Sequence, residues 1–332
     1  MQTMRDIKIR LKSIDSTRQI TQSMRLISNR KVQKMKKRME ENRPYLEQSV
    51  KVIDGVLSNP HFDSGEHIYI SGHKTEAAEN KDDNTDAAAQ PQPPLVIIIT
   101  GDRGLCGGYN ANVEREASNL MKKLGDAQVF AIGTKGRDYF RRRKRKIIRA
   151  YKGLSENPFY EDAQRIGEVA LEMFTGILPD GKTETELPRA DEIYLVYTEY
   201  HTMLSQTPKS VRLLPLDHDA VKNKLSSLKA KSKTADADTS GEEADLSMSY
   251  DSGEEAFFKQ AAWAYLSSVI FGAMLESATS EQCARLTGMD SAVKNSEKII
   301  DALTLQYNQM RQGAITQEIA EIVGGANAVE NK

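Results

Sequence analysis

The chain has 332 residues, and 46 Lys and Arg against 47 Asp and Glu leave a formal net charge of -1. This length suggests about two domains, and 39% hydrophobic residues are few for one globule of this size. Two cysteines far apart in sequence, Cys106 and Cys283, exclude a disulfide scaffold and a Cys-rich metal site. No apolar run approaches the ~20 residues of a membrane span. The start lacks the apolar stretch of a signal peptide, so we expect none.

The N-terminal segment, residues 1–57, is predicted to be one long basic helix. Residues 1–43 carry 13 Lys and Arg against four Asp and Glu. Apolar residues recur in steps of three and four, which is a helical pattern, but the register slips between groups. Pro44 is expected to kink or break the helix, because it lacks a backbone donor. The groups are Met4, Ile7, Leu11 and Ile14; Ile20, Met24 and Ile27; Val32, Met35 and Met39; and Leu46, Val50, Ile53 and Leu57.

Two stretches are predicted to be largely disordered inserts, residues 58–94 and residues 218–255. The first is rich in Asp, Glu and Ala and ends in a proline cluster, and the second is Lys-rich and then acidic. Both are too polar to offset the entropy of ordering. They divide the chain into an N-terminal helix, a middle domain over residues 95–217 and a C-terminal helix over residues 256–332.

The C-terminal helix is expected to pair with the N-terminal one. Each has only a narrow apolar stripe, which becomes buried when the two helices pack together. Before this stripe, residues 257–275 are apolar on most faces and should lie against something larger than one helix. A coiled-coil spacer or dimerisation stalk remains an open alternative from the pattern alone. The stripe is Leu286, Met289, Val293, Ser296, Ile300, Leu303, Tyr307 and Met310.

The middle domain alternates predicted strands with predicted helices, which implies a mostly parallel sheet flanked by helices, an α/β fold. The expected strands are residues 95–100, 128–132, 146–150, 193–200 and 210–216. The expected helices are residues 110–124, 134–143 and 161–177.

A Gly-rich turn, residues 100–110, follows the first strand. Such a turn before a helix could hold a phosphate on backbone N–H groups. However, a phosphate loop needs Lys-Ser/Thr after its last glycine, where Tyr109-Asn110 stands, and the spacing does not fit G-x-G-x-x-G. We therefore favour a structural turn with Asn110 as the helix N-cap.

No catalytic or metal-binding constellation is evident. Residues 141–149 hold seven basic residues of nine, which suits a solvated face or a contact with an acidic protein better than nucleic acid, because no aromatic residues are interleaved. His61, His67 and His73 lie six apart, and that spacing fits no regular metal geometry. We expect no catalytic residue, no cofactor and no metal.

Five segments make the chain resemble the γ subunit of F-type ATP synthase, the central rotor shaft. Together they cover 55 of the 332 residues, about a sixth of the chain, in the family's order. They are MRDIKIRLKSI (4–14), TRQITQSM (17–24), DRGLCGGYN (102–110), GTKGRDYF (133–140) and LQYNQMRQGAITQEIAEIV (305–323).

The resemblance implies a fold and a role. The family has a long antiparallel two-helix coiled coil of the N- and C-terminal helices with an inserted Rossmann-like α/β domain, the foot. The coil enters a ring of α and β subunits, and the foot rests on the ε subunit and on the membrane rotor ring of c subunits. A non-catalytic shaft of this kind transmits rotation to the β subunits, couples proton flow to ATP synthesis and regulates ATPase activity. It implies a peripheral protein on the cytoplasmic face of the bacterial inner membrane, with no transmembrane segment and no nucleic acid.

The resemblance also implies the residues that contact partners. Arg311, Gln312 and Thr316 match the region that meets loops of the ring, and Arg311 and Gln312 can donate several hydrogen bonds. Met24 and Arg25 match the region facing an acidic loop of a β subunit. The family's C-terminal signature opens with an arginine, here Arg285. For all six residues the alternative is a solvated helix surface.

The sequence departs from the family at Ser28-Asn29-Arg30, where small residues are usual, which puts a close approach of the helices in doubt. Two rival functions remain at this point. One is an α/β phosphate-binding enzyme with coiled-coil arms, and the other is a basic nucleic-acid tether.

Overall fold

The computed structural model describes residues 3–59, 67–72, 92–177, 185–232 and 254–330. It divides into two compact units: the first comprises Met1–Arg30 and Arg285–Lys332, and the second comprises Lys31–Ala284. Two long helices run through both units, α1 (Met4–Leu57) and α8 (Glu254–Glu330). The predicted mixed α/β fold with long terminal helices is confirmed.

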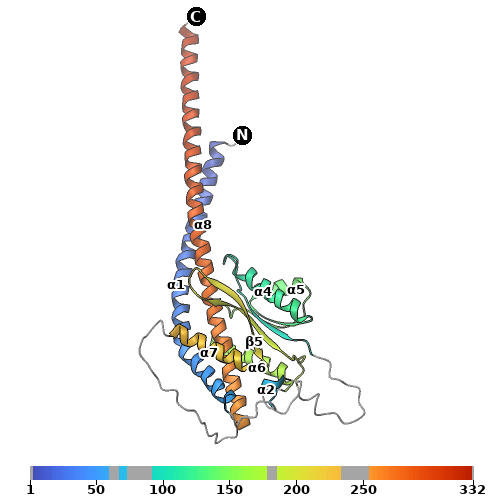
Figure 1. Ribbon diagram of the computed structural model, residues 1–332. Helices are drawn as coiled ribbons and strands as arrows, with labels where there is room; N and C mark the ends of the chain where they lie inside the picture. The colour runs from blue at the N-terminus through green and yellow to red at the C-terminus, as the bar shows by residue number, and fades with distance from the viewer. Residues whose placement is uncertain (1–2, 60–66, 73–91, 178–184, 233–253, 331–332) are drawn as a thin grey trace. The chain divides into compact units, whose positions relative to one another are not determined.

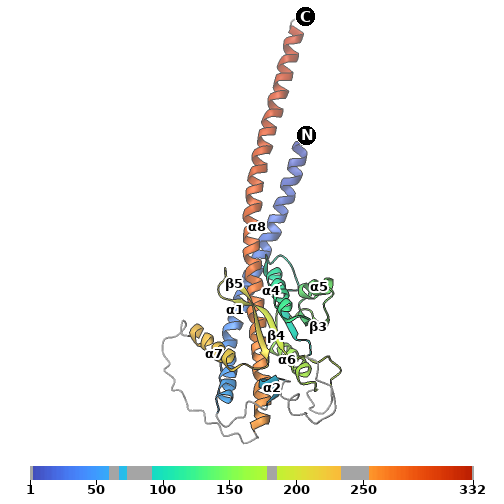
Figure 2. The same cartoon turned by 45° about the vertical axis from the view of Figure 1, so that its right-hand side comes forward.

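In the first unit α1 and α8 lie side by side and antiparallel (Figure 1, Figure 2). The eight stripe positions predicted on α8 are buried or half-buried there, whereas most of the residues between them are exposed. A narrow stripe on each helix suffices for this pairing, because only one side of each helix meets the other.

The second unit contains a five-stranded sheet in the order β3-β2-β1-β4-β5. β1 pairs in parallel with β2 and β4, β2 pairs in parallel with β3, and β5 is antiparallel to β4. The strands are β1 (Leu95–Ile99), β2 (Gln128–Ile132), β3 (Ile147–Tyr151), β4 (Ile193–Tyr200) and β5 (Gln206–Leu214).

Both faces of this sheet are buried, in two separate cores. Side chains alternate along a strand, so Val96 and Ile98 face a core shared with α4 (Tyr109–Leu124) and α5 (Thr134–Arg142). Leu95, Ile97 and Ile99 face the larger core, shared with α6 (Tyr160–Thr175) and parts of α1 and α8. The apolar stretch predicted over residues 257–275 is therefore covered by a sheet and helices.

The last strand begins four residues earlier than the sequence suggests, at Gln206 instead of residue 210. Its first residues are polar and include Pro208, which hid the strand. β5 lies at the edge of the sheet, and a proline is tolerated there because one side of an edge strand needs no backbone donor.

Both predicted inserts contain ordered parts, so the expectation of disorder is wrong for those parts. In the first, α2 (Ile68–Ser71) buries Tyr69 in the larger core. In the second, α7 (His218–Ser232) buries Val221, Leu225 and Leu228 in the same core. These three apolar positions at helical spacing outweigh the surrounding lysines. Residues 60–66, 73–91 and 233–253 lie outside the described residues.

α1 does not break at Pro44, since the helix runs without interruption to Leu57. Leu46 and Val50, just beyond the proline, are buried in the larger core. Packing of this kind offsets the hydrogen bond that a proline removes.

Candidate functional site

The buried side of α1 in the first unit keeps a single heptad register. Apart from Asp15, the buried or half-buried positions from Ile7 to Ser28 are spaced alternately by four and three residues, the spacing of a paired helix. We call this line of positions the α1 seam: Ile7, Leu11, Ile14, Arg18, Thr21, Arg25 and Ser28. The register slip predicted after Ile14 is therefore wrong.

The α1 seam becomes polar between Arg18 and Ser28, while apolar side chains lie outside it. Ile20, Met24 and Ile27 are 59%, 39% and 58% exposed. Fully burying a side chain of this size stabilises a protein by about 1.5–3 kcal/mol. Over these two turns of α1 the three apolar side chains remain in solvent and do not contribute this stabilisation. The exposed face that they form therefore has a role other than stabilising the helix pair.

Ser28 lies in the α1 seam and is only 2% exposed. Its side chain is small, so it permits a close approach of α1 and α8. The larger residues of Ser28-Asn29-Arg30, Asn29 and Arg30, do not lie between the two helices. Asn29 and Arg30 both lie on the exposed side of α1.

Ser28→Leu is expected to lower the free energy of unfolding by about 1–3 kcal/mol, because overpacking a tight contact forces the helices apart. Ser23→Leu is the matched control, since Ser23 is exposed on the same helix. Thermal melting followed by circular dichroism at 222 nm compares the two. Equal melting of the two variants would contradict the assignment of Ser28 to the α1 seam.

Of the predicted contact residues, Arg25 is bound across the two helices. Its Nη1 lies 2.9 Å from Oδ1 of Asp290 on α8, and its side chain is 35% exposed. Lys294 Nζ lies 2.8 Å from the other carboxyl oxygen of Asp290. Hydrogen bonds from Lys294 and Arg25 hold the pKa of Asp290 below its usual range. Met24, the neighbour of Arg25, points to the exposed side of α1.

The other predicted contacts lie on α8. Arg285 is half-buried, and Arg311, Gln312 and Thr316 are exposed. The Thr316 hydroxyl donates to the Gln312 carbonyl at 2.9 Å, so these two residues occupy successive turns on one side of the helix.

α8 continues well beyond the start of α1 (Figure 1, Figure 2). Every side chain from 311 to 326 is exposed, including a stripe of Ile315, Ile319, Ile322 and Val323. The predicted contacts therefore fall at two levels of the first unit. On α8, Asp290 is the partner of Arg25. Arg311 lies 21 residues beyond Asp290, which is about 32 Å of helix at 1.5 Å per residue.

The Gly-rich turn of the second unit is held by its own side chains. Asp102 accepts hydrogen bonds from the backbone N–H groups of Thr134 and Gly153, both at 2.9 Å. Asn110 accepts from the Gly101 N–H at 2.8 Å. Asn110 is thus not the N-cap of α4, as predicted, because that position is Gly108. Its amide holds the turn instead, and the structural interpretation of the turn fits these bonds.

A buried acid occupies the position where a phosphate would meet this turn. Glu281 of α8 is fully buried, and a Cβ atom at Gly101 would lie 2.9 Å from its carboxyl carbon. Burial raises the pKa of Tyr109, and the Glu281 carboxylate raises it further. In parallel α/β sheets this carboxyl edge is the usual ligand site. Here α8 fills it with the Glu281 side chain.

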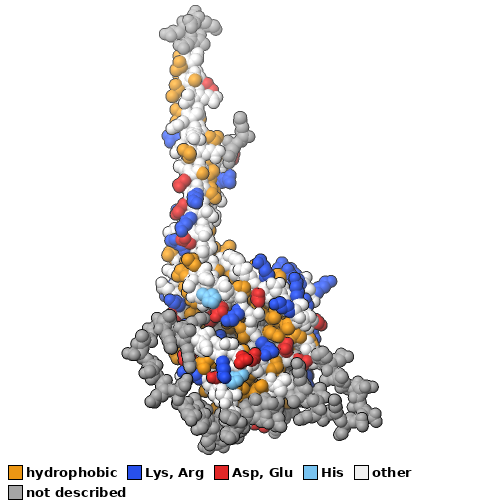
Figure 3. Space-filling view, viewed as in Figure 1, with side chains coloured by type: hydrophobic (Ala, Val, Ile, Leu, Met, Phe, Trp, Pro, Cys, Tyr) orange, Lys and Arg blue, Asp and Glu red, His pale blue; other side chains and the backbone are white. Residues whose placement is uncertain are grey.

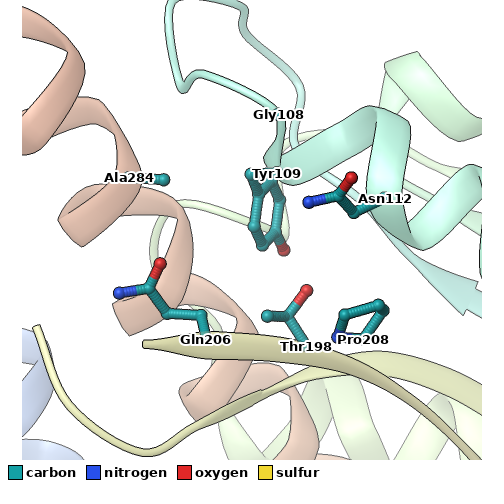
Figure 4. A pocket seen from close by; sticks show the side chains of 7 residues that line it. All are labelled: Gly108, Tyr109, Asn112, Thr198, Gln206, Pro208 and Ala284. Atoms are coloured by element: carbon teal, nitrogen blue, oxygen red, sulfur yellow. The ribbon is translucent and has the colours of Figure 1, made fainter. Parts of the chain in front are cut away.

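A small cavity of about 120 Å³ lies beside this turn (Figure 4). Tyr109 and Asn112 of α4 line one side, and Thr198 and Gln206 of the sheet line the other. Ligand pockets usually measure about 300–1,000 Å³. The cavity is therefore too small for a nucleotide.

Of the three histidines considered as metal ligands, the structure describes only His67. This residue N-caps α2, where its ring accepts from the Tyr69 N–H. His61 and His73 lie outside the described residues. Within the parts of the chain that the structure describes, no group of three or more His, Cys, Asp or Glu could hold a metal ion.

The basic stretch 141–149 lies at the end of α5 and along β3, and basic side chains gather over α4 and α5 (Figure 3). Arg141 pairs with Asp138 at 3.3 Å, and Arg143 stacks 3.5 Å from the ring centre of Tyr139. β3 is an edge strand, and cations on an edge strand protect it from pairing with other chains. This fits the predicted solvated face.

Glu114 lies half-buried beneath these cations. Burial raises its pKa to about 6, although Arg142 and Arg143 oppose the shift. The folded state thus holds the proton more tightly than the unfolded chain, so this group's contribution to stability falls as pH rises from about 4.5 to about 6.

Glu114→Gln is expected to stabilise the protein at pH 7 and to have a much smaller effect at pH 4, where both residues are neutral. Urea unfolding at the two pH values measures this difference. Glu116→Gln is the control on the same helix. A stabilisation by Glu114→Gln that is equal at both pH values would contradict the assignment.

Comparison with known proteins places the whole chain in one group. A family model described as ATP synthase matches residues 3–329. The chain is 36% identical to the ATP synthase gamma chain of Alkaliphilus metalliredigens, over 98% of this chain and 99% of that one. It is 35% identical to the sodium ion specific ATP synthase gamma chain of Acetobacterium woodii, over 99% of each chain.

Solved structures agree on the fold. A chain of the Euglena gracilis mitochondrial ATP synthase, in a structure of its OSCP, F1 and c-ring, is 18% identical with a TM-score of 0.58. The match covers 98% of this chain and 94% of that chain. A rotor chain of the same enzyme is 16% identical with a TM-score of 0.55, over 94% and 98%. Among the described residues, no helix is long and apolar enough to cross a membrane.

Proposed function

The chain belongs to the gamma chains of ATP synthase, and on that premise we propose that it transmits rotation of a membrane ring to the catalytic subunits of the complex. Gamma chains are non-catalytic rotor subunits of the central stalk. In this proposal the first unit turns inside a ring of α and β subunits, coupling proton flow to ATP synthesis and regulating ATPase activity. The second unit contacts the ε subunit and the c ring.

The observation that carries the proposal is the exposure of the C-terminal part of α8. All described side chains from residue 311 onward are exposed, and four of them form an apolar stripe. A single helix with an exposed apolar stripe is unstable in water and gains from enclosure by a partner. Arg311, Gln312 and Thr316 lie at the start of this stretch, where they can donate hydrogen bonds to loops of the ring. Met24, Arg25 and Arg285 form the second level of contact.

The filled edge of the sheet in the second unit supports a non-catalytic role. Glu281 occupies the carboxyl edge of the sheet, and the neighbouring cavity holds only about 120 Å³. The rival phosphate-binding enzyme therefore has no place for its substrate at the Gly-rich turn.

We further propose that the chain lies at the cytoplasmic face of a bacterial membrane, as a peripheral part of the complex. The bacterial gamma chains that it resembles support this location.

Reconstitution tests the function. The full chain, mixed with α and β subunits, is expected to co-purify as a complex whose ATPase activity exceeds that of the same subunits without it. The isolated chain is expected to hydrolyse no ATP. Hydrolysis by the isolated chain, or failure to join the complex, would contradict the proposal.

A further inference from the structure

Each residue in the polar part of the α1 seam is preceded in the sequence by an apolar residue that could face α8 in its place. Thr21, Arg25 and Ser28 face the seam, and the residue before each of them is apolar: Ile20, Met24 and Ile27. One residue corresponds to a turn of about 100° around the helix axis. A rotation of α1 by that angle would bury the three apolar side chains and expose the polar ones.

Within these two turns, hydrophobic burial favours a register that the structure does not adopt. Ile7, Leu11 and Ile14 hold the observed register earlier in α1, and a further contact is needed to hold it over these two turns. The contact in the right place is the ion pair between Arg25 and Asp290, whose nitrogen and oxygen lie 2.9 Å apart. Charge-assisted pairs of this kind are the stronger class of hydrogen bond.

We propose that Asp290 is a positioning residue, which holds Arg25 in the seam and thereby turns Ile20, Met24 and Ile27 outward as the contact face of α1. That Met24 contacts a partner rests on the proposed function, whereas the register itself does not. Lys294 also binds Asp290, at 2.8 Å from the second oxygen, and so fixes the carboxylate toward Arg25. A rotation of α1 would withdraw the guanidinium and leave Asp290 with Lys294 alone.

Thiol labelling of the full chain tests the register. Met24→Cys places a thiol at a position that is 39% exposed, and Ser28→Cys places one at a position that is 2% exposed. A maleimide is expected to label the first at least tenfold faster than the second. Cys106 and Cys283 are 2% and 0% exposed, and the parent chain gives their background rate.

Asp290→Asn is expected to reduce this rate ratio about threefold, by slowing labelling at position 24 and accelerating it at position 28, because an ion pair that is about one-third exposed is weakened by solvent. The charge-swapped pair Arg25→Asp with Asp290→Arg is expected to restore the ratio. Asp301→Asn is the matched control, because Asp301 is an exposed acid on the same helix.

Three results would overturn the proposal: an unchanged ratio in Asp290→Asn, no restoration in the charge-swapped pair, or equal acceleration at both positions, which indicates separation of the helices and not rotation. Labelling of the Met24→Cys variant after assembly with α and β subunits tests the proposed function separately. Protection on assembly supports the contact. Unprotected Met24→Cys alongside the expected free-chain ratios would reject the contact and leave the role of Asp290 standing.

Discussion

Gly133→Ala is expected to lower the free energy of unfolding of the second unit by at least about 3 kcal/mol. Gly133 joins β2 to α5 with φ 95° and ψ 145°, a conformation that is essentially restricted to glycine. A Cβ atom there would lie 2.1 Å from the Thr100 carbonyl oxygen, which is backbone and has no room to move. Strain and collision therefore act together at the centre of the sheet. Urea unfolding followed by the fluorescence of Trp263, the single tryptophan, measures the loss.

Two other glycines separate these two causes. Gly125 has φ 85°, and a Cβ atom added there would meet no atom within 4 Å, so Gly125→Ala carries strain alone and should cost about 1 kcal/mol. Gly104 lies outside the left-handed region of φ, and a Cβ atom added there would meet no atom within 4 Å, so Gly104→Ala should be almost neutral. If Gly133→Ala unfolded at the same urea concentration as Gly104→Ala, the β2–α5 connection described here would be wrong.

Gln312→Leu is expected to reduce ATP synthesis about tenfold while the complex still assembles. The Gln312 side chain is exposed on the unpaired part of α8, so its loss should leave the fold unchanged. Losing hydrogen bonds to a partner costs about 1.4 kcal/mol, which corresponds to a factor of ten. ATP synthesis and proton pumping in membrane vesicles that carry the variant complex measure the effect.

Gln317→Leu is the matched control for this experiment. Gln317 donates to Glu321 on its own helix at 3.0 Å, and it lies on a different side of α8 from Gln312. This variant is expected to retain most of the activity. Unchanged synthesis and pumping in Gln312→Leu, or equal losses in both variants, would reject the contact proposed for Gln312.

Much of the second unit could be predicted from local pattern. β2 and β4 match their predicted ranges, and most other elements differ by one or two residues at either end. Their apolar runs and the glycines between them are strong local signals. The start of β5 was missed because Gln206 and Pro208 are unusual in a strand, and only its place at the sheet edge makes them acceptable. α7 was missed because its lysines obscure three buried apolar positions.

The first unit shows why hydrophobicity alone misplaces a register. Following the apolar residues led to Ile20, Met24 and Ile27, which are exposed, whereas continued heptad counting from Ile14 leads to Arg18, Thr21, Arg25 and Ser28. The heptad count was available in the sequence. The ion pair that favours the heptad register could not be predicted from the sequence, because Arg25 and Asp290 are 265 residues apart.

Glu281 illustrates a second limit of sequence reasoning. Its residue type and helical setting resemble those of any solvated acid, and only the packing of α8 against the Gly-rich turn buries it. The sequence showed that the turn was a poor phosphate loop. It did not show that another part of the same chain fills the position.

The most direct test of the central claim is to watch the chain turn. A probe attached through Lys144→Cys, an exposed position in the second unit, would be followed in single complexes whose α and β subunits are fixed to a surface. With ATP present, the rotor account predicts stepwise rotation of the probe in one direction, which stops when ATP is removed. A probe that stays fixed while the complex hydrolyses ATP would contradict it.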